Sequence, residues 1–230
     1  MGGSGLVTWR TDDGRGFEGA RVLLHDGGLR ALGRMVRAGT GAADPPFTAS
    51  YRLDAGDGGR VRRLAVTSAT AGRERYLTLN RTDDGFWLHD TGLGSGRLDV
   101  TEAVDVDLAF SPLFNSVPIR RLGLHRATGD HVLSILFVAL PDLTVEVVEQ
   151  RYCTVSPLGQ RERPQEATRE RPQEATRERP QEATRERPQE ATVGFAWDAF
   201  TADLVVDADG VVLSYPGVAS RIPDAEPASP

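Results

Sequence analysis

Apolar and polar residues alternate with a period of two along most of the chain, which is typical of half-buried β-strands. Turn-forming residues separate these runs at short spacing, and Asp84-Gly85 predicts a hairpin turn. The pattern therefore predicts a mainly β fold: one strongly curved antiparallel sheet or half-barrel with few short helices. The strands are expected at residues 6–10, 18–25, 29–37, 48–53, 61–68, 75–80, 86–89, 131–140, 143–155, 200–206 and 211–215.

Helices are expected to be few, because no long stretch has apolar residues at helical spacing. The best candidates for short helices are residues 112–117 and 44–47. Residues 117–125 are expected to form a strand that the turn at 126–130 joins to 131–140. The run 132–140 is nearly continuous in apolar residues, which predicts a central strand covered on both faces.

Four identical copies of RERPQEAT occupy residues 161–192, between two expected strands. Removing these 32 residues from 230 leaves 198, which suits one domain over residues 1–222 with a disordered tail at 223–230. A proline in every eighth position disfavours a continuous helix. Since long surface insertions cost little loop entropy, we interpret the repeat as a tolerated insertion. The alternative is a scaffold whose repeat arm binds a protein partner.

The formal net charge of −6 and the lack of a basic block make nucleic acid or an anionic membrane a poor partner. None of the 27 basic residues is lysine, which excludes a Walker lysine and a Schiff-base lysine. Cys153 is the one cysteine, so an intrachain disulfide is excluded. The N-terminal residues do not resemble a signal peptide, and no apolar run approaches the ~20 residues of a membrane helix. A cytoplasmic protein is expected; the oligomeric state stays open.

The densest chemistry lies in residues 103–125. Alternation places Asp105 and Asp107 on one strand face, and Arg120 and Arg121 follow on the next element, where only one of them could reach the acidic face. Three interpretations are open. The charges could form a structural Asp-Arg pair; they could clamp a sugar or phosphate head group; or the carboxylates could catalyse hydrolysis, although no nucleophile or metal site accompanies them.

Further candidate ligand-binding residues are polar or aromatic. Asn115 lies in a proline-bounded loop, where it could either satisfy backbone groups or contact a ligand. The aromatic residues could pack in a core or line a cavity for an acyl chain, and the candidates for the second role are Trp87, Tyr152 and Tyr215. The four scattered histidines make a weak metal site even where His125 and His131 could face each other, so no metal and no cofactor are expected.

The segment DVDLAFSPLFNSVPIRRL at 105–122 resembles the signature of the family of "putative glycolipid-binding" proteins. PDLTVEVVEQRY at 141–152, FTADLVVDADGVVLSYPGVASR at 200–221, and GFEGARV with a later GFW agree with it in order. The RERPQEAT block departs from that pattern.

The resemblance implies a curved antiparallel sheet similar to the LolA-type lipoprotein carriers, with an apolar cavity on its concave side. It further implies a non-enzymatic protein that binds a lipid or glycolipid. The sequence does not determine whether the concave side is open or filled by side chains. The alternative to a binding function is a hydrolase that uses Asp105 or Asp107.

Overall fold

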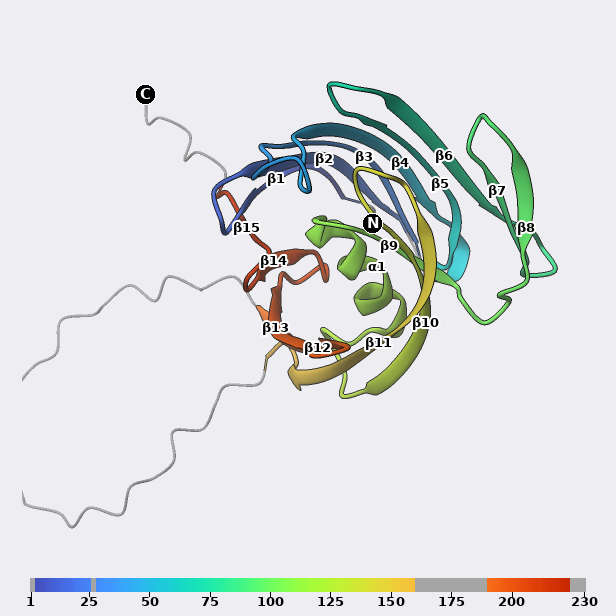
Figure 1. The fold of residues 1–230 in the computed structure, drawn as a ribbon. Helices are drawn as coiled ribbons and strands as arrows, with labels where there is room; N and C mark the ends of the chain where they lie inside the picture. The colour runs from blue at the N-terminus through green and yellow to red at the C-terminus, as the bar shows by residue number, and fades with distance from the viewer. Residues whose placement is uncertain (1–2, 26–27, 160–189, 224–230) are drawn as a thin grey trace, which may run out of the picture.

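The computed structural model describes residues 3–25, 28–159 and 190–223. Their strands belong to one curved, open sheet in the order β8-β7-β6-β5-β4-β3-β2-β1-β15-β14-β13-β12-β11-β10-β9 (Figure 1). Among the described residues, neighbouring strands pair antiparallel except for β9 and β10, which are parallel. The predicted fold class is therefore confirmed: the protein is mainly β, with one strongly curved sheet.

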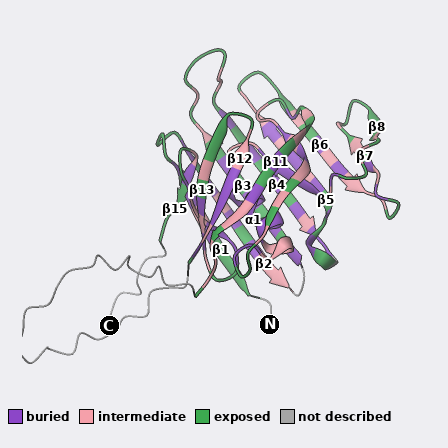
Figure 2. Ribbon diagram, turned by 90° about the horizontal axis from the view of Figure 1, so that it is seen from below, coloured by how far each residue is buried: buried purple, intermediate pink, exposed green. Residues whose placement is uncertain are grey.

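The first half of the sheet is a meander of long strands. Its members are β1 (Ser4–Thr11), β2 (Gly16–His25), β3 (Gly28–Arg37), β4 (Phe47–Ala55), β5 (Val61–Ala69), β6 (Glu74–Arg81), β7 (Trp87–Asp90) and β8 (Ser95–Leu98), with a short 3-10 turn η1 (Asp57–Gly59) between β4 and β5. Burial alternates along these strands, as the period-two pattern predicts (Figure 2). The strands expected at 6–10, 18–25, 29–37, 48–53, 61–68 and 75–80 all lie within observed strands.

The second half of the sheet curves back to β1. It contains β9 (Asp105–Leu108), β10 (Asp130–Val138), β11 (Val145–Ser156), β12 (Ala191–Trp197), β13 (Phe200–Val206), β14 (Val212–Tyr215) and β15 (Ala219–Arg221). Strands β8, β12 and β15 were not predicted. The last two residues of the RERPQEAT block belong to β12, while 160–189 lie outside the described residues, as does nearly all of the expected tail.

One α-helix, α1 (Pro112–Leu122), lies on the concave side of the sheet (Figure 1). Proline at its first position suits a helix start, and Gly123 ends it in the left-handed conformation at φ 68°. The amide of Leu124 then donates to the Ile119 carbonyl at 3.0 Å. The helix is buried from Pro112 to Ile119, which explains why its sequence is apolar on nearly all sides rather than amphipathic.

Two of the predicted elements are wrong. Residues 117–125 are not a strand, because α1 continues to Leu122 and the arginines form its last turn, so β10 instead pairs with β9 and β11. The short helix expected at 44–47 is absent, because Asp44 forms a bridge with Gly41 and Phe47 begins β4. The start of a helix at Pro112 was predicted correctly.

The core lies between α1 and the inner face of the sheet. Two indole groups anchor it, since Trp9 Nε1 donates to the Val212 carbonyl and Trp87 Nε1 to the Ala103 carbonyl, both at 2.8 Å. The amide of Val212 also donates to Ser116 Oγ at 3.0 Å, which attaches α1 to β14. The concave side is thus occupied by a helix and packed side chains.

Candidate functional site

The expected Asp-Arg pair is present where α1 meets β9. Arg121 Nη2 lies 2.5 Å from Asp105 Oδ2, and its Nε donates to Oδ1 at 3.2 Å. Asp105 is fully buried, and burial raises the pKa of its carboxyl, while Arg121, Arg60 and Arg81 act in the opposite direction. Arg120 does not reach Asp105; it donates to the backbone carbonyl of Asp209 instead.

Asp107, two residues further along β9, belongs to a different polar group. Gln150 Nε2 donates to Asp107 Oδ2 at 2.8 Å, and the Tyr152 hydroxyl lies 2.9 Å from both Gln150 Oε1 and Asn115 Oδ1. Burial raises the pKa of Asp107 to about 6, and the Gln150 amide opposes this. The structure therefore brings three of the predicted site residues, Asp107, Asn115 and Tyr152, into one buried network in which each is hydrogen-bonded.

The aromatic candidates do not share one site. Tyr152 packs edge-to-face against Phe195 at 5.2 Å between ring centroids, and Phe195 packs similarly against Tyr215 at 5.6 Å. Trp87 belongs to the other core cluster, on β7, where its ring is fully buried. All three rings lie in the packed core, and a role for them in ligand binding stays a prediction.

A buried carboxyl that the sequence analysis missed lies on β2. Glu18 Oε1 accepts hydrogen bonds from the Tyr51 hydroxyl at 2.5 Å and from Ser111 Oγ at 2.7 Å, while Oε2 has no partner within the described ranges. Burial raises the pKa of Glu18 to about 7, although both hydroxyls lower it. Alternation was the available signal, because Glu18 shares its strand face with the buried Ala20 and Val22.

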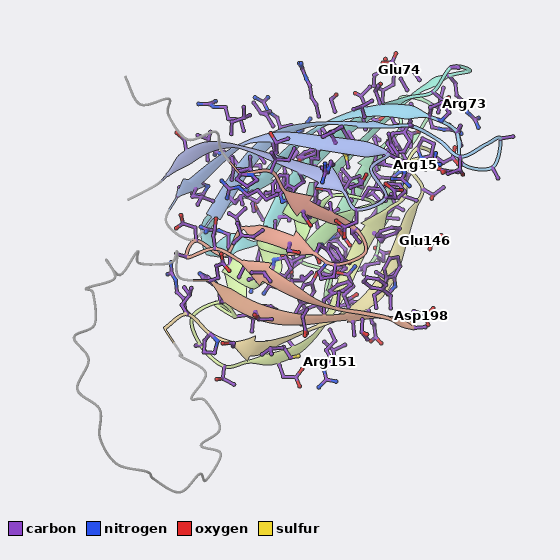
Figure 3. The ribbon with its side chains drawn as sticks, turned by 90° about the vertical axis from the view of Figure 1, so that its left-hand side faces the viewer. Arg15, Arg73, Glu74, Glu146, Arg151 and Asp198 are labelled. Carbon is purple, nitrogen blue, oxygen red and sulfur yellow. The ribbon has the colours of Figure 1, made fainter. Side chains whose placement is uncertain are left out.

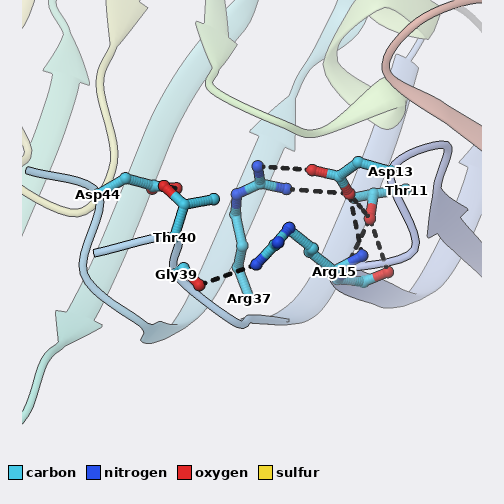
Figure 4. Close-up of polar contacts among 8 residues, drawn as sticks. Thr11, Asp13, Arg15, Arg37, Gly39, Thr40 and Asp44 are labelled. Atoms are coloured by element: carbon cyan, nitrogen blue, oxygen red, sulfur yellow. Dashed lines mark hydrogen bonds and ion pairs between the residues drawn. The ribbon is translucent and has the colours of Figure 1, made fainter.

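An exposed ionic cluster lies just before the start of β2, near the same end of the strand as Glu18. Arg37 Nη2 lies 2.8 Å from Asp13 Oδ2, and Arg15 donates to the Gly39 carbonyl (Figure 4). Hydrogen bonds from Thr11, the Arg15 amide and Arg37 lower the pKa of Asp13 to about 2. Every charged group in this cluster serves to join the β1–β2 turn to the β3–β4 loop, so we interpret it as structural.

A pocket of about 260 Å³ lies at the C-terminal end of α1. One wall is the last turn of the helix with the residues after it, and the other is formed by the β2–β3 and β4–β5 connections. Three arginines line it: Arg120, Arg121 and Arg126. We call it the arginine-histidine pocket, because His125 also lines it.

His125 is the unusual member of this pocket. Its side chain is buried, and neither ring nitrogen has a hydrogen bond of good geometry within the described ranges, although the Ile119 carbonyl lies close enough to raise its pKa. Burial lowers the pKa of His125 to about 4, with Arg126 and Arg120 acting in the same direction and the Ile119 carbonyl and Asp209 opposing them. The imidazole is therefore neutral at pH 7, with one donor and one acceptor nitrogen.

Glycines bring the chain close to this pocket. Gly59 has φ +72°, and a Cβ there would lie 2.9 Å from Arg121 Cβ. A Cβ at Gly210 would lie 3.0 Å from His125 Nδ1 and 2.9 Å from Arg120 Cγ. Side chains larger than glycine at these positions would displace the arginines and the imidazole.

The structure thus places two of the predicted site residues, Arg120 and Arg121, at the pocket and leaves the rest in the core. The sequence analysis considered His125 only as a metal ligand. Among the residues that the structure describes, no group of three or more His, Cys, Asp or Glu side chains could hold a metal ion. The described ranges also contain no helix with the length and hydropathy needed to span a bilayer.

A search of curated proteins found no match. Among solved structures, the chain is similar to a crystal structure of a DUF1089 family protein from Pseudomonas aeruginosa. The TM-score is 0.62 and the sequence identity 23%, over 90% of this chain and 92% of the other. At this identity the likeness shows a shared fold.

The family model described as "Putative glycolipid-binding" matches residues 6–176. The chain therefore belongs to this family, as its sequence signature predicted.

Proposed function

We propose that the protein binds an amphiphilic ligand, a lipid or glycolipid, and that the arginine-histidine pocket receives its anionic, hydroxyl-bearing head group. The observation that carries this proposal is His125, a buried imidazole whose two nitrogens have no hydrogen bond of good geometry among the described residues, although the Ile119 carbonyl lies nearby. A buried polar group without a hydrogen bond costs about 1–3 kcal/mol. A ligand hydroxyl or phosphate oxygen in the pocket would remove that cost.

The charges around the pocket support an anion. Arg126 is exposed at the rim, and Arg120 and Arg121 use part of their donors on Asp209 and Asp105, while a guanidinium carries five N–H donors in total. The C-terminus of α1 carries partial negative charge, and the arginines of the last turn offset it. Guanidinium groups suit phosphate and carboxylate oxygens.

The neutral imidazole supports a head group with hydroxyls. Because one nitrogen donates and the other accepts, His125 can bind both an anionic oxygen and a sugar or glycerol hydroxyl. A volume of about 260 Å³ suits a head group rather than a whole lipid, so the acyl chains would lie elsewhere on the protein.

We further propose that the protein acts by binding and not by catalysis. Asp105 and Asp107, the carboxylates considered for hydrolysis, are buried, and Arg121 and Gln150 respectively hold them. No observation favours the hydrolase, and the scaffold hypothesis concerns a repeat that lies almost entirely outside the described residues.

Thermal unfolding with soluble short-chain probes tests the proposal. We expect a short-chain phosphatidic acid or an alkyl glycoside to raise the melting temperature of the wild type, since a ligand specific to the folded state stabilises it. His125→Ala and Arg126→Gln should reduce this increase, and His131→Gln is the matched control. If neither probe stabilises the wild type, or if the pocket variants respond as the control does, the pocket is not a head-group site.

A further inference from the structure

The outer surface of strands β1 to β6 carries a concentration of positive charge that is not visible along the sequence. Outward-pointing arginines from different strands lie on it, all of them exposed: Arg10, Arg21, Arg30, Arg34, Arg52 and Arg63. We call this surface the arginine face. Only Asp54 and Glu74 oppose these charges among the outward residues of β1 to β6.

The strand register brings these arginines together. Arg21 on β2 is opposite Leu32 on β3, which is opposite Arg52 on β4. Two residues further along the same two strands, and on the same face, Gly19 is opposite Arg34. In the other direction, Arg30, Asp54 and Arg63 form a row across β3, β4 and β5. Arginines that are far apart in sequence therefore become near neighbours on one surface.

Most of this charge is not neutralised by the protein. Arg30 pairs with Asp54 at 3.3 Å, and Arg63 donates to Asn80. Arg21, Arg34 and Arg52 have no hydrogen-bond or ion-pair partner among the described residues. Because arginine stays charged at any physiological pH, the surface is permanently cationic.

The opposite half of the sheet has the reverse polarity. The exposed charged residues of β11 to β13 are Glu146, Glu149 and Asp203 against the single Arg151. Figure 3 shows Arg73 and Glu74, at the start of β6, on one side of the molecule and Arg151 of β11 on the opposite side. A chain with net charge −6 is thus strongly polarised.

Apolar side chains are exposed between the arginines. Leu6 is 69% exposed and Leu32 44%, and Phe17, Val36 and Tyr76 are also exposed on this face. Two shallow hollows of about 680 and 610 Å³ lie among these side chains. Three of these side chains are aliphatic: Leu6, Leu32 and Val36 lie among the arginines, alongside the aromatic rings of Phe17 and Tyr76. Aliphatic groups suit the interface of a bilayer, where head groups meet acyl chains, better than they suit nucleic-acid bases, which prefer aromatic stacking.

From this complementarity we propose that the arginine face docks on an anionic phospholipid bilayer. The arginines bind head-group phosphates and carboxylates, and the exposed leucines enter the interfacial layer. Each arginine near an anionic membrane contributes about a fivefold increase in binding. This proposal does not depend on the head-group pocket, which lies on the other side of the sheet from the face.

Co-sedimentation with vesicles tests the docking. The probes are phosphatidylcholine vesicles with and without about 30 mol% phosphatidylserine. We expect the full chain to bind only the anionic vesicles and to dissociate as salt rises. Arg21→Gln with Arg52→Gln should weaken binding more than tenfold, while Arg97→Gln with Arg151→Gln, which changes the net charge equally, should not.

Three results would overturn the proposal: equal binding to neutral and anionic vesicles, equal loss in both double variants, or binding to an oligonucleotide at salt concentrations at which vesicles do not bind. His125→Ala separates this proposal from the proposed function, because it should reduce stabilisation by a short-chain ligand and leave vesicle binding at the wild-type level.

Discussion

Arg121 Nη2 lies 2.5 Å from Asp105 Oδ2, and this ion pair joins the end of α1 to β9 with the carboxylate fully shielded from water. Arg121→Met would leave a buried carboxylate without its partner, and we expect it to reduce the free energy of unfolding by about 3–5 kcal/mol. Urea denaturation measures this.

The control for this substitution is Arg97→Met, which removes the exposed pair with Asp99. Its cost should be at most about 1 kcal/mol. Adding Asp105→Asn to Arg121→Met should recover part of the lost stability. A double variant as unstable as the sum of the two single variants would show that the pair is not coupled.

Glu18→Gln should remove a pH dependence of stability. The pKa of Glu18 is about 7 in the folded protein against 4.5 ordinarily, so the folded state binds more protons between these values and stability falls as pH rises through this window. The loss amounts to about 3 kcal/mol between pH 4.5 and 7. Gln keeps an acceptor for Tyr51 and Ser111 without a charge.

We therefore expect Glu18→Gln to be more stable than the wild type at pH 8 and to differ little from it at pH 4.5. Denaturation across this pH range measures the difference, and Glu74→Gln, at an exposed position, is the control. An unchanged pH profile in Glu18→Gln would contradict the assignment of a raised pKa to this carboxyl.

Tyr152→Phe should destabilise the protein by about 1–3 kcal/mol, because the hydroxyl contacts both Asn115 Oδ1 and Gln150 Oε1 in a buried network. Tyr76→Phe, at an exposed ring, should change stability by less than about 0.5 kcal/mol. Equal effects of the two substitutions in thermal denaturation would mean that the buried hydroxyl contributes nothing.

Gly59→Ala should cost about 1–3 kcal/mol, because Gly59 has φ +72° and a Cβ would meet Arg121 Cβ at 2.9 Å. Gly72→Ala is the control, since a Cβ there meets nothing within 4 Å. The melting temperatures of the two variants measure the difference. If Gly59→Ala is as stable as Gly72→Ala, the loop can move away from α1.

The family and the mainly β fold could be recognised from the sequence. The physical reason is that strand alternation and turn formation depend on residues that are neighbours in the sequence. Each long strand of the first half shows its burial pattern in its own residues, as β4 does. The start of α1 was also local, because Ser111 and Pro112 mark it. Its continuation through Arg121 was missed, since Pro118 and the adjacent arginines favour a break, and packing on every side of the helix overrides that preference.

The sites were decided by tertiary structure. Asp105 and Asp107 look equivalent in the sequence, yet one meets Arg121 from α1 and the other Gln150 from β11, because those neighbours arrive from elsewhere in the chain. His125 has no distinguishing neighbours in sequence. Only the packing of the chain around the end of α1, near η1 and Gly210, buries it without a hydrogen bond of good geometry to a described residue. The arginine face shows the same separation: composition determines the net charge, whereas strand register determines where the charges meet.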